Sequence, residues 1–247
     1  MRISSTKITE LVAQNYVYAS VLHYFGIEFY NYSEQTLAQV CKEKGLDITK
    51  VIAKLEDAVE ERKDPAVVKL PLDLVIEYLK HMHYVFVKQR LPYIANLIDH
   101  IKSSHTLHHR VAKDLKMVFP LFVEDFILHI YEEEDEVFSY INFLAKALQF
   151  KCNYAQLYYT LEKKSIQDFA TKHHDHDDEM KGIRKITENY TLQDASDQHM
   201  CVLYAELKAF EKELIMHASV EDEVLLPKAL ELENQVRKMF EKKALLN

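Results

Sequence analysis

Two segments of this chain, centred on histidines 88 residues apart, carry nearly the same pattern. They read FVEDFILHIYEEEDEVF, at 122–138, and FEKELIMHASVEDEVLL, at 210–226. In each segment a Phe stands seven residues before the His, and a Glu stands four residues after it. Positions i, i+3, i+4 and i+7 share one face of an α-helix. Both segments therefore predict long helices that carry an imidazole and a carboxylate on an otherwise apolar face.

The composition fits a fold built from such helices. The 247 residues include only 3 glycines and 5 prolines, with 48% hydrophobic and 28% charged residues, so we expect an all-α chain with a substantial core. Long helical patterns predict an up-down-up-down four-helix bundle, with helices at 72–102, 108–149, 162–190 and 196–224. A shorter segment follows from Pro227, and 151–164 reads as a helical turn or a loop.

The first 62 residues read as a separate set of short helices. One is expected at 6–24, a second at 33–45 with Ser33 as its N-cap, and a third after Asp47. The stretch ERKDPAVVKLP, at 61–71, mixes charges with two prolines and is typical of a linker. We therefore predict a small helical N-terminal domain at 1–62, a linker at 63–71 and the four-helix bundle at 72–247. The bundle also contains the candidate metal ligands that are derived from helical periodicity.

Charge and cysteine content exclude several classes of function. The net charge is −8, and lysines and arginines are interleaved with acids, which argues against a nucleic-acid partner. No apolar run could cross a bilayer and the N-terminus has no signal-peptide core, so we expect a cytoplasmic protein without a membrane partner. Cys41, Cys152 and Cys201 form no C-x-x-C motif. A metal would therefore be bound by nitrogen and oxygen.

Helical periodicity and the 13 histidines together suggest a ligand set. The apolar stripes of the predicted bundle helices carry five histidines and two carboxylates: His83, His105, His129, His173, His217, Glu133 and Glu221. A bundle core with these groups can balance two cations held by imidazoles and bridged by carboxylates. Mixed nitrogen and oxygen ligation fits iron better than magnesium or calcium, with zinc as the alternative.

Two positions in this set have competitors. In the cluster HHDHDD, at 173–178, the helical face favours His173, His174 points elsewhere, and His176 falls in the same stripe as His173. The second copy of the pattern alone offers two acids, Glu221 and Asp222, and the helical angle favours Glu221, which stands four residues after His217. The acidic run 132–136 reads as a solvated face except at Glu133. A single His-x-x-x-Glu pair is commonly a local hydrogen bond, but two copies with matched flanks favour a metal site.

These residues resemble the hemerythrin-like "repair of iron centres" family of di-iron proteins. The resemblance rests on His83-x8-Pro92-x12-His105, on His129-x3-Glu133, on His173, and on His217-x3-Glu221 followed by VLLPKAL. The His-Asp pair of that family fits His174-Asp175 equally well after a shift of one residue. It implies two iron ions that are bridged by the two glutamates, and an oxo group can form an additional bridge between them. The five histidines would be the terminal ligands. It also implies a role in repairing or protecting iron–sulfur clusters under nitrosative or oxidative stress, by donating iron or by reacting with nitric oxide.

The N-terminal segment resembles the small helical domain of that family, over ITELVAQNYVYASVLHYFGIEFYNYSEQTLAQVCKEKGLD. The family carries adjacent cysteines where this chain has Tyr30 and Asn31, so no thiol role is assigned. Expected partners are damaged iron–sulfur proteins and small molecules such as nitric oxide or oxygen, and a homodimer is compatible with the sequence. The alternatives are a hemerythrin-like module that binds or senses oxygen or nitric oxide, and a metal-free helical interaction protein. The sequence does not decide whether the chain is an enzyme.

Overall fold

The computed structural model describes residues 3–58, 67–101, 106–149, 152–174, 178–192 and 197–244, and the side chains of these except 106–108, 172–174 and 243–244. Over these ranges the chain folds into helices, and the only extended pairing is an isolated bridge between Lys7 and Thr36. The protein is thus an all-α helical bundle, as the sequence predicts. None of the helices described is long and apolar enough to span a membrane.

The helices form two compact units. The first comprises Met1–Asp64, Arg90–Phe119 and Gly182–Lys212, and the second Pro65–Gln89, Pro120–Lys181 and Glu213–Asn247. Helices α7 (Thr106–Glu132) and α12 (Gln198–Val220) each contribute to both units. The domain boundaries expected at residues 62 and 71 stay a prediction.

Short helices make up most of the first unit. They are α1 (Ile8–Gln14), α2 (Val17–Tyr24), α3 (Leu37–Lys44), α4 (Ile48–Asp57), α6 (Leu91–Asp99) and α11 (Lys181–Ile186). The helix expected at 6–24 is divided because the Asn15 side chain accepts the Val17 N–H at 3.0 Å and starts α2. Thr36, and not Ser33, caps α3 through a capping box with Gln39. Gly45 ends that helix with a φ of 66°, which glycine adopts without strain.

Tyr30 makes a hydrogen bond and a ring contact within the first unit. Its hydroxyl donates to Oδ1 of Asn96 at 2.9 Å, and its ring stacks on His100 at 5.0 Å between centroids. Burial, with a smaller contribution from the charge of Glu28, raises the pKa of Tyr30 to about 12. The position therefore serves packing in this chain.

Tyr30→Phe is expected to change stability in a pH-dependent way. At pH 8 the variant should lose about 1 kcal/mol, the contribution of one hydrogen bond. Above pH 10 the unfolded tyrosine loses its proton while the folded one retains it, so the wild type loses stability as pH rises from 10 towards 12. Phenylalanine does not ionise, so the stability of the variant should not fall for this reason between pH 10 and pH 12. Urea unfolding at pH 8 and pH 11 checks the prediction, and a constant difference between the two proteins would contradict it.

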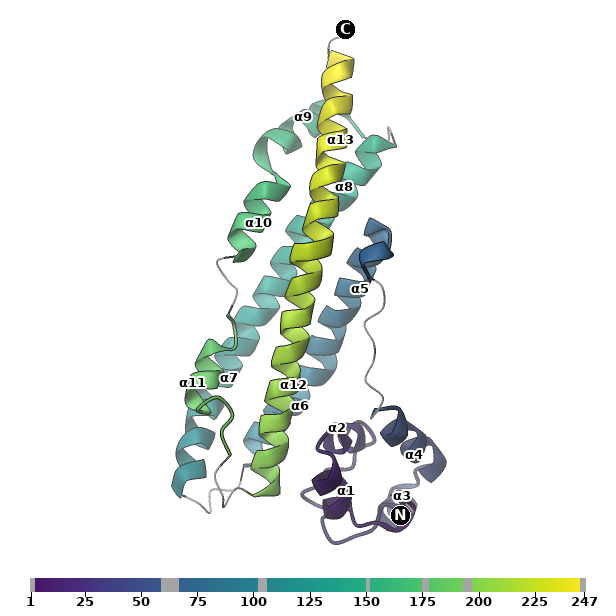
Figure 1. Ribbon diagram of the computed structural model, residues 1–247, viewed down its shortest axis with the longest axis vertical. Coiled ribbons are helices and arrows are strands. Elements are labelled where there is room, and N and C mark those ends of the chain that lie inside the picture. The colour runs from purple at the N-terminus through teal and green to yellow at the C-terminus, as the bar shows by residue number, and fades with distance from the viewer. Residues whose placement is uncertain are drawn as a thin grey trace. The chain divides into compact units, whose positions relative to one another are not determined.

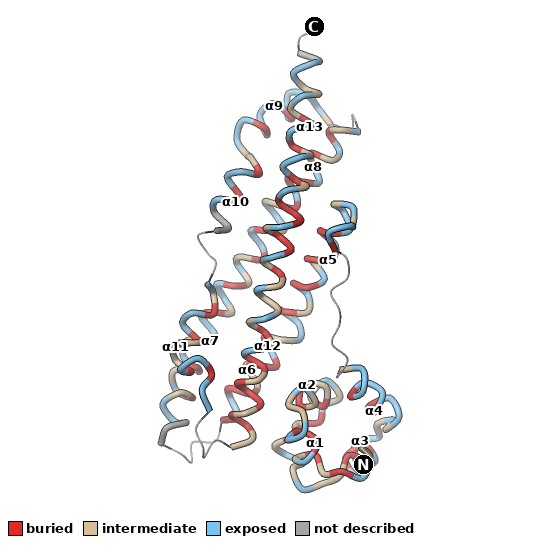
Figure 2. The backbone as a smooth tube through the Cα atoms, in the orientation of Figure 1, coloured by how far each residue is buried: buried red, intermediate tan, exposed pale blue. Residues whose placement is uncertain are grey.

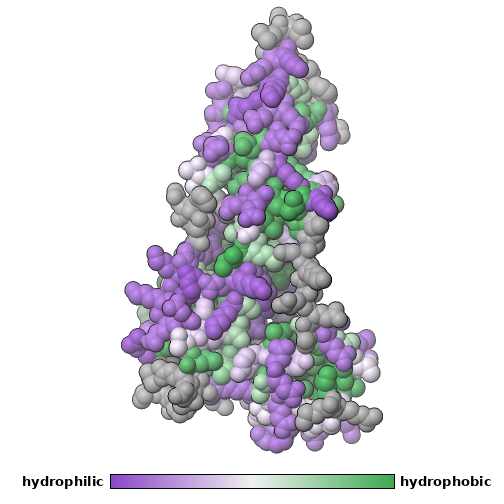
Figure 3. All heavy atoms as spheres, viewed as in Figure 1, coloured by the Kyte–Doolittle hydropathy of each residue, from purple (hydrophilic) through white to green (hydrophobic). Residues whose placement is uncertain are grey.

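The second unit holds the longer helical segments. Besides parts of α7 and α12 it contains α5 (Leu72–Val85), α8 (Ser139–Leu148), α9 (Tyr154–Lys163), α10 (Ile166–His174) and α13 (Leu226–Ala244). Helices α8 and α10 pack against α13 (Figure 1). Buried and exposed residues alternate along both α8 and α13 (Figure 2). The part of the surface that α13 forms in Figure 3 is mainly hydrophilic. The core includes Val75, Leu79, Phe138, Ile141, Leu144, Leu157, Val224, Leu225 and Val236.

Three π-helical segments interrupt the long helices: η3 (Phe86–Arg90), η4 (Glu133–Phe138) and η5 (Glu221–Leu225). Two of them precede a Leu-Pro pair, at Pro92 and Pro227. Proline lacks an N–H and its ring collides with the carbonyl four residues earlier, and a wider turn relieves both problems. The helix therefore continues from α12 through η5 into α13, where the sequence suggested a separate segment from Pro227.

Two further expectations change. The helix predicted at 162–190 is divided, because α10 ends at His174 and α11 begins at Lys181. The uncertain segment at 151–164 forms α9, whose first turn is capped by Asn153. The buried carboxylate of Glu233 on α13 accepts the Ile166 N–H at 2.8 Å and fixes the start of α10.

Candidate metal centre

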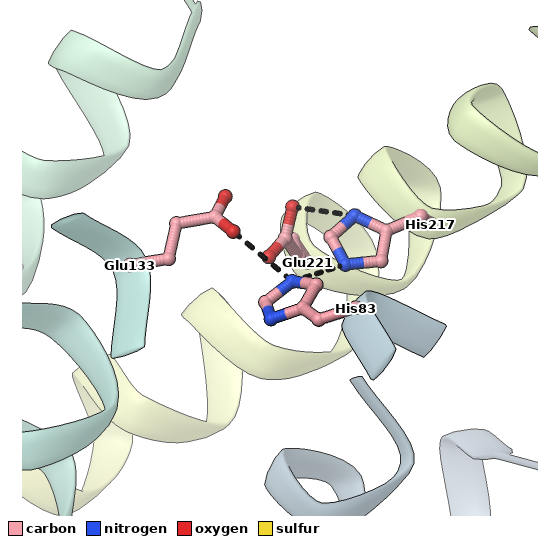
Figure 4. Close-up of side chains that lie close together, drawn as sticks. All are labelled: His83, Glu133, His217 and Glu221. Atoms are coloured by element: carbon pink, nitrogen blue, oxygen red, sulfur yellow. Dashed lines mark hydrogen bonds and ion pairs between the residues drawn. The ribbon is translucent and has the colours of Figure 1, made fainter. Parts of the chain in front are cut away.

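Four buried side chains of the second unit converge on one point (Figure 4): His83 of α5, Glu133 of η4, His217 of α12 and Glu221 of η5. One nitrogen or oxygen atom from each lies within 4.8 Å of all the others. Both glutamates are the first residue of a π-helical segment and stand four residues after a histidine. The repeated sequence pattern thus produces a repeated local geometry, with two helices presenting their acids to the same space.

The two oxygens of Glu133 face different histidines. Its Oε2 lies 3.2 Å from Nε2 of His83, and its Oε1 lies 3.0 Å from Nε2 of His129. These histidines belong to different helices, so the carboxylate stands between them. A carboxylate in this position can bind two cations, one through each oxygen, each shared with one imidazole.

Separations between the remaining donor atoms test whether a cation fits. Nε2 of His83 lies 2.8 Å from Nε2 of His217 and 3.2 Å from Oε2 of Glu133. Glu221 lies 3.2 Å from the other ring nitrogen of His217, Nδ1, and it belongs to the group whose ligand atoms lie within 4.8 Å of one another. Two ligands at right angles on a metal, with bonds of about 2.1 Å, stand about 3.0 Å apart. The two separations at Nε2 of His83 are therefore those of ligands on one transition-metal ion, and imidazole with carboxylate suits iron or zinc.

Aromatic rings cover this group of ligands. The Phe138 ring stacks on His83, with centroids 5.8 Å apart and an angle of 4° between the planes, and Phe86 meets His217 edge-on at 5.7 Å. Both phenylalanines are only 1% exposed. Water is therefore excluded from one side of the site, where a carboxylate without a counter-charge is costly. The buried surroundings therefore favour a bound cation over a His–Glu pair that forms only a local hydrogen bond.

Without a metal, protons on the imidazoles balance the carboxylates. Burial lowers the pKa of His129, but its hydrogen bond with Glu133 and the charges of Glu133, Glu179 and Glu221 outweigh burial and raise the pKa to about 9. Burial likewise lowers the pKa of His217, and the charge and hydrogen bond of Glu221 more than compensate, so the net shift is upward. A metal ion that binds these nitrogens must displace their protons.

Glu134 has a role that the sequence did not indicate. The run 132–136 was expected to be solvated apart from Glu133, yet Oε1 of Glu134 accepts a hydrogen bond from Nδ1 of His83 at 2.8 Å. The π-helical turn that begins at Glu133 changes the angle between successive side chains, so that two adjacent glutamates reach His83. A carboxylate behind a histidine fixes the ring and leaves Nε2 for a metal.

Glu134→Ala is expected to weaken metal binding about 10- to 100-fold, since the His83 ring loses the partner that orients it. The fold should persist, because Glu134 is only half-buried. Titration with Co²⁺ or Zn²⁺ measures the effect. Glu136→Ala, an exposed position in the same segment, is the matched control and should bind metal as the wild type does. Equal affinities for both variants would contradict the assigned role.

The other predicted ligands are described only in part. His105 and His176 lie outside the described residues, and so do the side chains of His173 and His174 on α10. Their roles stay predictions. Asp222, the competitor of Glu221, lines a groove with Ile166, Leu226 and Pro227, whereas Glu221 faces the histidines.

Comparison with known proteins gives a distant relative. No family model matches the chain. The chain is 21% identical over 210 residues to the iron–sulfur cluster repair protein YtfE of Musicola paradisiaca (strain Ech703). The match covers 83% of this chain and 87% of that protein. The similarity therefore extends over most of both sequences at low identity.

Proposed function

We propose that the chain is a di-iron protein of the hemerythrin-like "repair of iron centres" family, which repairs or protects iron–sulfur clusters under nitrosative or oxidative stress. The observation that carries this proposal is the Glu133 carboxylate, which has one oxygen at His83 and the other at His129. Such a carboxylate suits a pair of metal ions. The distant similarity to an iron–sulfur cluster repair protein, over most of both chains, supports the choice of iron and of the process.

In this proposal the described ligands fall into two groups. His83, His217 and Glu221 would hold one iron ion, and His129 would hold the other, with Glu133 shared between them. His105 and His173 would complete the second group. Glu221 reaches the same space as Glu133 and would act as the second bridge.

The two bound iron ions would supply a change of oxidation state and a coordination position for a small molecule. The residues of the chain exclude water, orient a ligand and release a proton. Phe86 and Phe138 exclude water from one side, and Glu134 holds the His83 ring. His129 would release its proton to solvent when a metal ion binds, which would leave a neutral nitrogen as the ligand.

Metal content and cluster recovery test this proposal. Protein purified without oxygen should contain two iron ions per chain, and its optical spectrum should change with nitric oxide. It should also restore a [4Fe–4S] hydro-lyase damaged by nitric oxide. His83→Ala should remove iron and recovery, whereas His81→Ala, an exposed position on the same helix, should retain both. Failure of the wild type to bind iron would overturn the proposal. Reversible oxygen binding without recovery would replace repair by carriage or sensing.

A further inference from the structure

The candidate metal centre is unevenly exposed. The side chains of His83, His217 and Glu221 are 3%, 9% and 4% exposed, whereas those of His129 and Glu179 are 24% and 26% exposed. The donor atoms around His129 are therefore more open to solvent than Nε2 of His83, whose exposed neighbour Glu134, at 33%, lies behind the ring at Nδ1. An ion that enters or leaves from solvent meets His129 first.

Glu179 lies at this exposed side, in the turn that precedes α11. Its Oε1 stands 3.8 Å from Nε2 of His129, which is too far for a hydrogen bond. Two ligands of one metal ion with bonds of about 2.1 Å stand between about 3.0 Å and about 4.2 Å apart, depending on the angle. The separation fits a cation between the two side chains.

The charges around Glu179 also favour a cation. Glu179 is close enough to Glu133 and Glu221 to be repelled by their carboxylates, and it interacts with the imidazoles of His129 and His217. A third carboxylate beside two others is unfavourable unless positive charge is added. Neither the repeated pattern nor the family resemblance gives Glu179 a role.

We propose that Glu179 is a further carboxylate ligand of the centre, which binds the metal ion on the His129 side and makes that side the route of entry and exit. This inference rests on the proposed metal centre. Glu179 belongs to a turn between helices, so its backbone is not part of a continuous helical ladder and the carboxylate can follow an ion. The ion on the His83 side, held by buried ligands, exchanges more slowly.

Release of metal from the full-length protein tests the inference. The protein is loaded with two equivalents of Co²⁺, and a chelator in excess removes them while the visible spectrum is recorded. The wild type should lose one equivalent quickly and one slowly. Glu179→Gln should speed the fast phase at least about 10-fold, change the spectrum of one equivalent, and leave the slow phase unchanged. Asp178→Asn, at the exposed neighbouring position, should behave as the wild type does.

The outcomes separate this inference from the proposed function. Two bound equivalents with unchanged or slower release in Glu179→Gln would overturn the role of Glu179 and leave the metal centre in place. No binding by the wild type would overturn the metal centre itself. Circular dichroism of the metal-free variant checks that it is folded. Glu179→Asp, which retains a carboxylate on a shorter side chain, should release the fast equivalent at a rate between those of the wild type and Glu179→Gln.

Discussion

Glu133→Gln should abolish tight metal binding at both positions of the centre. The substitution retains the shape of the side chain, but it replaces a carboxylate whose oxygens face His83 and His129 by a neutral amide. An amide nitrogen does not bind a cation, so at least one position loses a ligand and both lose negative charge. Because loss of a residue that merely orients a ligand costs about 10- to 100-fold, we expect at least about 100-fold here. Calorimetric titration with Co²⁺ measures the loss.

The same variant should lose the stabilisation that metal gives. A ligand that binds only the folded chain contributes about 4 kcal/mol at a concentration of 1,000 Kd, which raises the melting temperature of a chain this long by about 10 °C. A chelator should lower the melting temperature of the loaded wild type by that amount and leave Glu133→Gln unchanged. Glu136→Gln, exposed in the same π-helical segment, is the control and should respond as the wild type does. A chelator-sensitive Glu133→Gln would contradict the bridging position.

The repeated pattern predicts part of the geometry of the candidate metal centre from sequence. The spacing of four residues from His129 to Glu133 and from His217 to Glu221 predicts that each pair shares one helical face, and the structure has both pairs in contact. The apolar stripe of α5 likewise indicates His83. The contact within each pair is predictable because helical periodicity relates residues within one helix, whereas the role of these residues as metal ligands stays a prediction. The positions of His105 and His173 stay predictions.

The contacts of Glu134 and Glu179 could not be predicted from helical periodicity. Glu134 reaches His83 because a π-helical turn breaks the regular period at Glu133, and no proline marks that turn in the sequence. Glu179 lies in a turn where one continuous helix was expected, so its angle on a helical wheel had no meaning. Both contacts join different elements, and they depend on packing that local periodicity does not encode.

Phe138→Ala should be among the most destabilising single substitutions in the second unit. Phe138 is 1% exposed, belongs to the hydrophobic core and stacks on His83. Removing a buried phenyl ring leaves a cavity and costs about 3–5 kcal/mol. Urea unfolding of the metal-free protein measures this. Phe138→Leu, which retains most of the volume, should cost less than about 1.5 kcal/mol. A loss below 1 kcal/mol for Phe138→Ala would show that the ring is not part of a tightly packed core.

Phe138→Ala should also speed the release of metal, because water then reaches the face of the His83 ring that Phe138 covers. Loss of stability alone could produce faster release, so the comparison needs a variant with a similar cavity elsewhere in the core. Leu144→Ala serves, since Leu144 is fully buried in the same core, on helix α8. We expect about 2–5 kcal/mol of destabilisation for it, with the slow phase of metal release close to that of the wild type. Equal acceleration in both variants would mean that Phe138 acts only through stability, whereas acceleration confined to Phe138→Ala assigns the ring to the protection of the metal ligands.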